Sequence, residues 1–311
     1  MLNRIQADKL ESTTFRVGYH GDDENFKQMT LRDGRYLKPY ATEHEHETAQ
    51  VMAYYWLTHM EQTLKERTGV FYATGKSILV DAFVTFDGDI DNNGTSDIVV
   101  KSNASFMPYK NGSIYMGYVE NPDESVAHEM ALSAEVYIHE MGHGNLYWAS
   151  SVNNKGTPQP LNDNNLNQSL YDNYGVFSCT SAAGCFRAIH EGQADFYNAI
   201  IFSKYDEAGQ FVLNSVSLGE TWFNNVTGID VLPGVPRDPR NDKFTEIFKT
   251  NNDIYDGVIR YAKKGNSKVA VQGEIHDLGA YYASILWQIY SEPKTNKPIF
   301  EKTFMRHLSM L

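Results

Sequence analysis

The sequence of 311 residues predicts an α+β fold in two lobes, with a mixed or antiparallel sheet in the first lobe and mainly helices in the second. One long segment has apolar residues at helical spacing, short β-branched runs with Gly and Asn turns follow, and several later segments again have helical periodicity. A polar, Asn-rich stretch at 150–169 interrupts the pattern. We therefore expect an N-terminal lobe over 1–148 and a C-terminal lobe over 149–311.

Taken in order, the segment 42–69 predicts a helix that begins with a capping box from Thr42 to Glu45 and stops at Gly69. The three β-branched runs predict strands, and from about residue 124 we expect helix. The strand runs are 77–86, 96–109 and 112–119, and the later helical segments are 185–202, 279–290 and 299–311.

The charge balance argues against two classes of partner. Lys and Arg number 27 against 39 Asp and Glu, a formal charge of -12, which repels nucleic acid and anionic lipid. No apolar run is long enough for a membrane helix, and the first residues lack the apolar region of a signal peptide. The aromatic and Asn-rich composition nevertheless favours a secreted or periplasmic protein. Cys179 and Cys185 could close a small disulfide loop or remain free thiols.

The sequence "VYIHEMGHGN" at 136–145 places polar groups within an apolar run. Residues four apart share one face of a helix, so His139 and His143 can grip one cation while Glu140 reaches a water on it. The alternative is a helix with two hydrogen-bonded histidines. Unpaired imidazoles would be costly in so apolar a segment, which favours the metal.

A hydrolytic zinc site needs a third protein ligand and an open position for water. The segment "HEGQAD" supplies Glu191 and Asp195, which are four apart and can face the same site. One would bind the metal, and the other would accept the free N–H of a ligating histidine. His190 points about 100° away from Glu191 on a helix, so we prefer Glu191 as the ligand. A solvated acidic face is the alternative.

With HEMGH and ExxxD assembled, the chain resembles the thermolysin-like zinc peptidases, or gluzincins, and in its helix after "GEIHD" the fungalysins. The resemblance implies a two-lobed zincin fold that binds Zn²⁺ through His139, His143 and Glu191. It makes Glu140 the general base and places Asp195 behind the ligands. It also implies that His276 stabilises the oxyanion.

Further stretches carry the resemblance to the substrate site. "NASFMPY" is similar to the edge strand of that family, implying that Asn103 and Ala104 pair with the substrate backbone. "VPRDPRN" makes Arg237 the candidate that binds the substrate carbonyl, and Val136 would line the pocket for an apolar residue after the cut. The segment between HEMGH and Glu191 is longer than the family pattern and suggests a lid or specificity insert. The tyrosine that helps to bind the oxyanion stays open between Tyr147, Tyr171 and Tyr174.

The sequence "DGDIDNNGTSD" predicts a second metal site, this one for Ca²⁺. Its oxygen donors occur at alternate positions, and Gly94 permits a sharp turn, a pattern that suits a hard cation. An ordinary Asp/Asn/Gly turn is the alternative. The candidate ligands are Asp89, Asp91, Asn93, Thr95 and Asp97.

The sequence therefore predicts a zinc endopeptidase that binds an extended polypeptide, with no nucleic acid partner and no membrane span. Two other functions remain open: a zincin-scaffold module for binding or adhesion without turnover, and a glycopeptidase whose long insert reads sugar. The presence of all the residues that the mechanism needs counts against the binding module.

Overall fold

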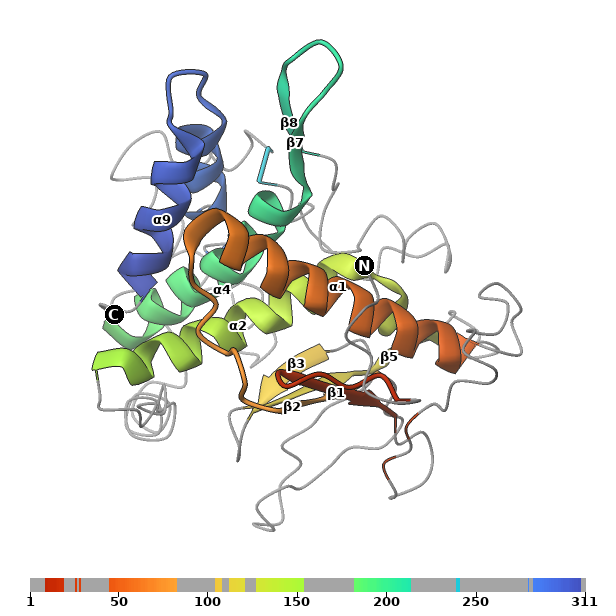
Figure 1. Cartoon of the computed structure of the whole chain (residues 1–311). Helices are drawn as coiled ribbons and strands as arrows, with labels where there is room; N and C mark the ends of the chain where they lie inside the picture. Colours follow the sequence, from red (N-terminus) through yellow and green to blue (C-terminus); the bar gives the residue numbers. More distant parts are fainter. Residues whose placement is uncertain are drawn as a thin grey trace, which may run out of the picture. The chain divides into compact units, whose positions relative to one another are not determined.

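The computed structural model describes two compact units of mixed helix and strand, which confirms the α+β prediction at this level (Figure 1). One unit comprises Met1–Asn145 with Gly219–Pro233, and the other comprises Leu146–Leu218 with Gly234–Leu311. The predicted division at 148 and 149 and the zincin arrangement stay predictions. The residues that the structure describes are 9–19, 26, 28, 45–82, 104–107, 112–120, 127–153, 182–213, 239–240, 279 and 282–308.

A four-stranded mixed sheet forms the base of the first unit, with strand order β1-β2-β4-β3. The pairs β1–β2 and β2–β4 are parallel, whereas β3 pairs antiparallel with β4. The strands are β1 (Phe15–Gly18), β2 (Ile78–Asp81), β3 (Ala104–Met107) and β4 (Ser113–Met116). The mixed sheet and the strands β2, β3 and β4 were predicted. Strand β1 was not, because its four residues are too few to show an alternation of apolar and polar side chains.

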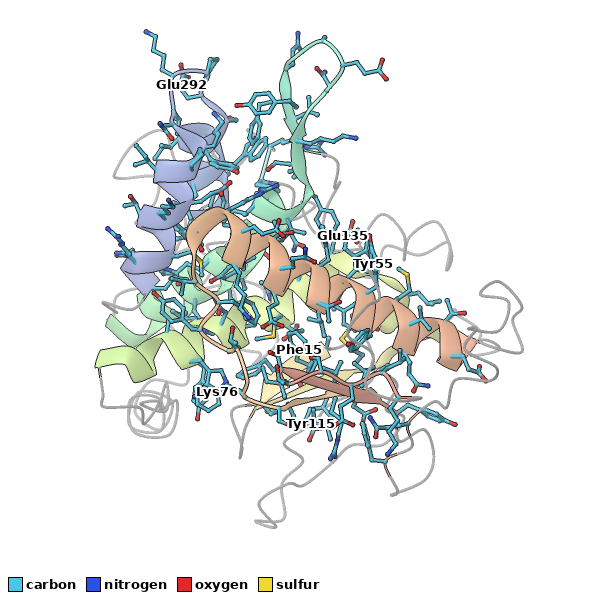
Figure 2. All side chains as sticks on the ribbon, viewed as in Figure 1. Phe15, Tyr55, Lys76, Tyr115, Glu135 and Glu292 are labelled. Atoms are coloured by element: carbon cyan, nitrogen blue, oxygen red, sulfur yellow. The ribbon has the colours of Figure 1, made fainter. Side chains whose placement is uncertain are left out.

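The register of these strands makes one face of the sheet apolar. Paired residues such as Phe15 and Ile78, or Phe106 and Ile114, point to the same face, and neighbours along a strand alternate. Figure 2 shows Phe15 on the side of the sheet that α1 covers and Tyr115 on the opposite side. The residues of the covered face are Phe15, Val17, Ile78, Val80, Ala104, Phe106, Ile114 and Met116.

Helix α1 (Glu45–Thr68) lies over this face and contacts β1 (Figure 1). Leu57, Met60 and Leu64, spaced three and four apart, are fully buried, and each such side chain stabilises the fold by roughly 1.5–3 kcal/mol. The predicted stop at Gly69 is confirmed: its φ is 83°, and its N–H donates to the carbonyl of Lys65 at 2.9 Å. Thr42, the predicted cap, lies outside the described residues.

Helix α2 (Ala134–Asn153) carries the HEMGH sequence, and its start corrects the prediction. Residues 127–129, expected to be helical, form β6 (Ala127–Glu129), which pairs with β5 (Tyr118–Glu120). A single turn of 3₁₀ helix, η2 (Met130–Leu132), follows. Pairing with β5, the preceding strand in the chain, satisfies the backbone groups of this segment, and the apparent helical pattern of residues 124–129 does not reveal it.

Two hydrogen bonds tie α2 to the rest of the first unit. The Tyr137 hydroxyl donates to the carbonyl of Ala49 on α1 at 3.1 Å. The amide oxygen of Asn145, fully buried, accepts the N–H of Tyr72 at 2.8 Å. These contacts bracket His139, Glu140 and His143, so both ends of the motif are fixed.

In its described residues the second unit is mainly helical, beginning with α4 (Ala182–Phe202), and it has a hairpin that the sequence did not predict. Phe196 of α4 makes edge-to-face contacts with Tyr290 and Phe304, which form an aromatic core with Phe211 and Trp287. No helix among the described residues is long and apolar enough to cross a membrane. The elements are α4 (Ala182–Phe202), β7 (Ser203–Tyr205), β8 (Phe211–Leu213), a helix over 282–291 and α9 (Lys297–Leu308).

Replacing Asn145 with Ala should lower the free energy of unfolding by about 1–3 kcal/mol, because the N–H of Tyr72 loses its acceptor in a partly buried place. Urea unfolding followed by tryptophan fluorescence measures the change. The control is Gln62→Ala, which removes an exposed contact to Glu66 and should cost no more than about 0.5 kcal/mol. Equal midpoints for the two variants would contradict the anchoring role of Asn145.

Candidate metal centre

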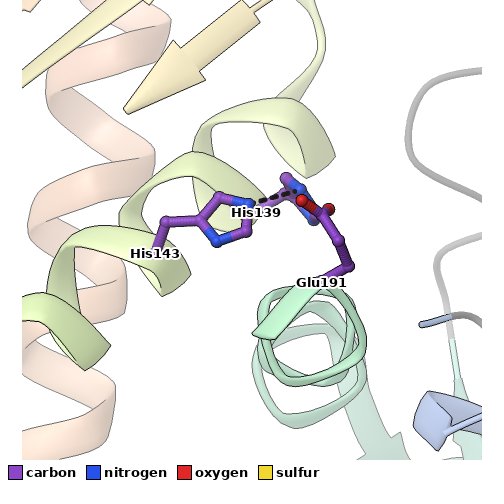
Figure 3. A group of neighbouring side chains, drawn as sticks. All are labelled: His139, His143 and Glu191. Carbon is purple, nitrogen blue, oxygen red and sulfur yellow. Dashed lines mark hydrogen bonds between the residues drawn. The ribbon is translucent and has the colours of Figure 1, made fainter. Parts of the chain in front are cut away.

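Helix α2 brings two imidazole rings into direct contact. The Nε2 atoms of His139 and His143 lie 3.0 Å apart, and their rings are nearly perpendicular with centroids 4.6 Å apart (Figure 3). This geometry follows from the spacing of four residues, which stacks side chains on one helical face. The helix therefore presents two nitrogen donors at one point.

The short N–N distance has a chemical consequence. Two nitrogen lone pairs 3.0 Å apart repel unless something positive lies between them, so one Nε2 must carry a proton or both must bind a cation. Two nitrogens bound tetrahedrally to zinc at ~2.0–2.1 Å would lie about 3.3 Å apart. A shift of a few tenths of an ångström thus converts the hydrogen-bonded pair into a pair of zinc ligands.

Glu191 of α4 completes a three-residue cluster with these histidines. One donor atom from each of His139, His143 and Glu191 lies within 4.8 Å of the others (Figure 3). His139 is buried, while His143 and Glu191 keep partial exposure. Among the described residues, this is a group that could hold a metal ion, and it includes Glu191 and not the neighbouring His190.

The donor set fits zinc in its chemistry. Two imidazole nitrogens and one carboxylate oxygen are the ligands of one class of catalytic zinc sites, which leave the fourth position for water or substrate. A calcium or magnesium site would instead be built from oxygen atoms alone. The residues therefore suit zinc better than a hard cation.

Buried acids accompany the cluster on both helices. Glu140, next to His139, is 6% exposed, and Asp195, one helical turn after Glu191, is 2% exposed. A carboxylate leaves water only where charge or hydrogen bonds compensate, and a metal ion held by the cluster would supply such a charge. Gln193 and Asn198 of α4 are also buried, and sequence reasoning did not single them out. The position of these amides among the apolar residues of the second half of α4 was the sequence signal that could have identified them.

Gly192, the residue after Glu191, lies where another part of the backbone comes close to α4. A Cβ on Gly192 would lie 2.2 Å from the carbonyl oxygen of Gly279 and 2.9 Å from Cδ1 of Tyr282. Neither the backbone at Gly279 nor the core of α4 can yield cheaply to such an overlap. Gly192 is therefore needed for this close approach, one residue after Glu191.

Other predicted site residues are placed as follows. Ala104 is half-buried in β3, and Val136 is buried in α2. Tyr147, the one described member of the three candidate tyrosines, contacts Trp148 edge-to-face, and burial raises the pKa of its hydroxyl.

Several sequence predictions lie outside the described residues and stay predictions. Cys185 lies in α4, and the pairing of the two cysteines stays open. The residues outside the described part are Asp89, Asp91, Asn93, Thr95 and Asp97 of the calcium loop, Asn103, Arg237, His276, Tyr171, Tyr174 and Cys179.

A scan against protein-family models finds no match to this chain, and a search of curated proteins finds no significant relative.

Gly192→Ala should weaken zinc binding by about tenfold, because the added methyl group forces α4 away from Gly279 and moves Glu191. Competition with a zinc-chelating dye, corrected for the folded fraction, measures the affinity.

The control is Gly209→Ala in the turn after β7. There a Cβ would meet nothing within 4 Å, although the φ of 74° makes the substitution strained. It should lower stability and leave the zinc affinity as it is. A Gly192→Ala protein that binds zinc as tightly as wild type would show that the close approach does not position Glu191.

Proposed function

We propose that the chain is a zinc-dependent endopeptidase of the thermolysin-like kind. The observation that carries the proposal is the cluster of His139, His143 and Glu191, with the carboxylate of Glu140 buried beside it on the same helix. The sequence resemblance at HEMGH and ExxxD supports the same assignment. Zinc, when bound, supplies a Lewis acid that polarises the scissile carbonyl and acidifies the attacking water.

Glu140 is the general base of the proposed reaction. Its carboxylate takes the proton of the attacking water and delivers it to the nitrogen of the leaving amine, which balances the hydrolysis. Asp195 accepts the remaining N–H of a ligating histidine and fixes its tautomer. By the sequence resemblance, His276 donates a hydrogen bond to the oxyanion.

The substrate would be an extended polypeptide that adds to the sheet at β3. In the described part of the chain, β3 is the last strand in the sheet order, and all four of its residues are half-buried. Such an edge offers backbone hydrogen bonds to an extended peptide, independently of the peptide's sequence. Asn103 and Ala104 would make these bonds, Arg237 would bind a carbonyl, and Val136 would favour an apolar residue after the cut.

The predicted calcium loop at Asp89, Asp91, Asn93, Thr95 and Asp97 would add a structural Ca²⁺ in the same unit. A secreted or periplasmic location suits a peptidase with such a site. The calcium ion and the location are proposed from the sequence alone.

Glu140→Gln should lower turnover by at least about a hundredfold and leave zinc binding intact, because the amide keeps the shape of the side chain but cannot accept the proton. Mass-spectrometric mapping of cleavage sites in an unfolded proteome, with zinc-loaded proteins, gives the readout. We expect the cuts of the wild-type protein to precede apolar residues, to vanish with a chelator and to return with zinc.

The matched control is Glu135→Gln on the same helix. Its carboxylate accepts a hydrogen bond from Ser133 at 3.1 Å and lies outside the metal cluster, so cleavage should persist. Wild-type cleavage that survives in Glu140→Gln would rule out the proposed mechanism.

A further inference from the structure

The strand β3 meets the metal-ligand helix at a glycine. A Cβ on Gly144, the residue after His143, would lie 2.7 Å from Cε2 and 3.1 Å from Cδ2 of Phe106. It would also lie 2.6 Å from Cε of Met141. The Phe106 ring therefore occupies the space that a side chain at position 144 would fill, directly against the backbone of α2.

The direction of the Phe106 side chain links this contact to the face of the sheet. Phe106 pairs with Ile114, and Ala104 pairs with Met116, and both partners on β4 are fully buried. Because residues two apart on a strand share a face, Ala104 and Phe106 both point toward the helical side. Ala104 and the Phe106 ring that packs on α2 at Gly144 therefore lie on the same face of one strand.

A glycine at this position is unfavourable for the helix by itself. Glycine lowers helix stability relative to alanine, because its backbone loses more freedom on folding. Position 144 lies within α2, ten residues after its first residue, Ala134, and is buried. The absent side chain is therefore explained by what packs there, which is the Phe106 ring from β3 together with Cε of Met141.

We propose that the packing of the Phe106 ring against Gly144 sets the separation between β3 and the helix that carries His139 and His143. This separation positions an extended substrate at the metal centre. This inference rests on the proposed function. Gly144 and Phe106 are positioning residues: they act through the strand and not on the reacting atoms. Their contact lies wholly within the first compact unit.

Gly144→Ala provides the test. The added methyl group must push the Phe106 ring and with it β3, whereas the two histidines stay on an unbroken helix. For a labelled octapeptide with a central leucine we expect KM to rise about tenfold with kcat within about twofold of wild type, the signature of lost binding that is equal in ground and transition state. Zinc affinity and the hydrolysis of a blocked dipeptide, which is too short to lie along β3, should change less than about twofold.

A size swap separates positioning from general damage. Phe106→Leu removes the ring atoms that oppose the new methyl group, so the double variant Gly144→Ala/Phe106→Leu should recover most of the lost affinity for the octapeptide. Met141→Leu removes the other opposing atom, Cε of Met141, but leaves β3 untouched. Gly144→Ala/Met141→Leu should therefore remain as weak as Gly144→Ala alone.

Peptide binding measured by fluorescence anisotropy in the zinc-loaded Glu140→Gln background makes every outcome decisive. If wild type cleaves the octapeptide and Gly144→Ala binds it as tightly as wild type, the positioning role is overturned and the peptidase function is supported. Binding that weakens in Gly144→Ala and returns with Phe106→Leu, without cleavage by wild type, would support the positioning role and overturn the peptidase. If wild type neither cleaves nor binds the octapeptide, both the peptidase and the positioning role are overturned. If Met141→Leu restores binding and Phe106→Leu does not, the positioning role alone is overturned.

Discussion

Two imidazole nitrogens held 3.0 Å apart set the condition on which the rest of the site depends. A proton or a cation between the two nitrogens makes this arrangement favourable, and a rigid helix keeps the rings at this separation. The anchors at Tyr137 and Asn145 lie before and after this pair and tie α2 to α1 and to the segment at Tyr72. Packing in the first unit thus fixes the helix that presents both rings at one point.

Two glycines, one on α2 and one on α4, allow close packing beside the cluster. At Gly144 an aromatic ring from β3 rests on the backbone of α2, and at Gly192 the backbone of residue 279 approaches α4. Each glycine directly follows a residue of the cluster, His143 in one case and Glu191 in the other. Close packing at such points transmits position with little slack, because a protein interior has few voids to absorb a shift.

Sequence reasoning identified the parts of the structure that depend on local pattern. The spacing of His139 and His143, the choice of Glu191 over His190 and the stop at Gly69 all follow from the geometry of a single helix. The strand at 127–129 and the hairpin after α4 were mistaken or missed because their strands are only three residues long, and β1 was missed because its partner β2 lies far along the chain. The roles of Gly144 and Gly192 were missed for the same reason: a glycine in a helix shows no partner until the opposing strand or backbone is in place.

The burial of Glu140 links the fold to the proposed chemistry. A carboxylate at 6% exposure is expensive without compensation, and a nearby dication would supply it in the folded protein. Metal affinity and the stability of α2 are then linked through one charge balance, and removing the metal should disturb both.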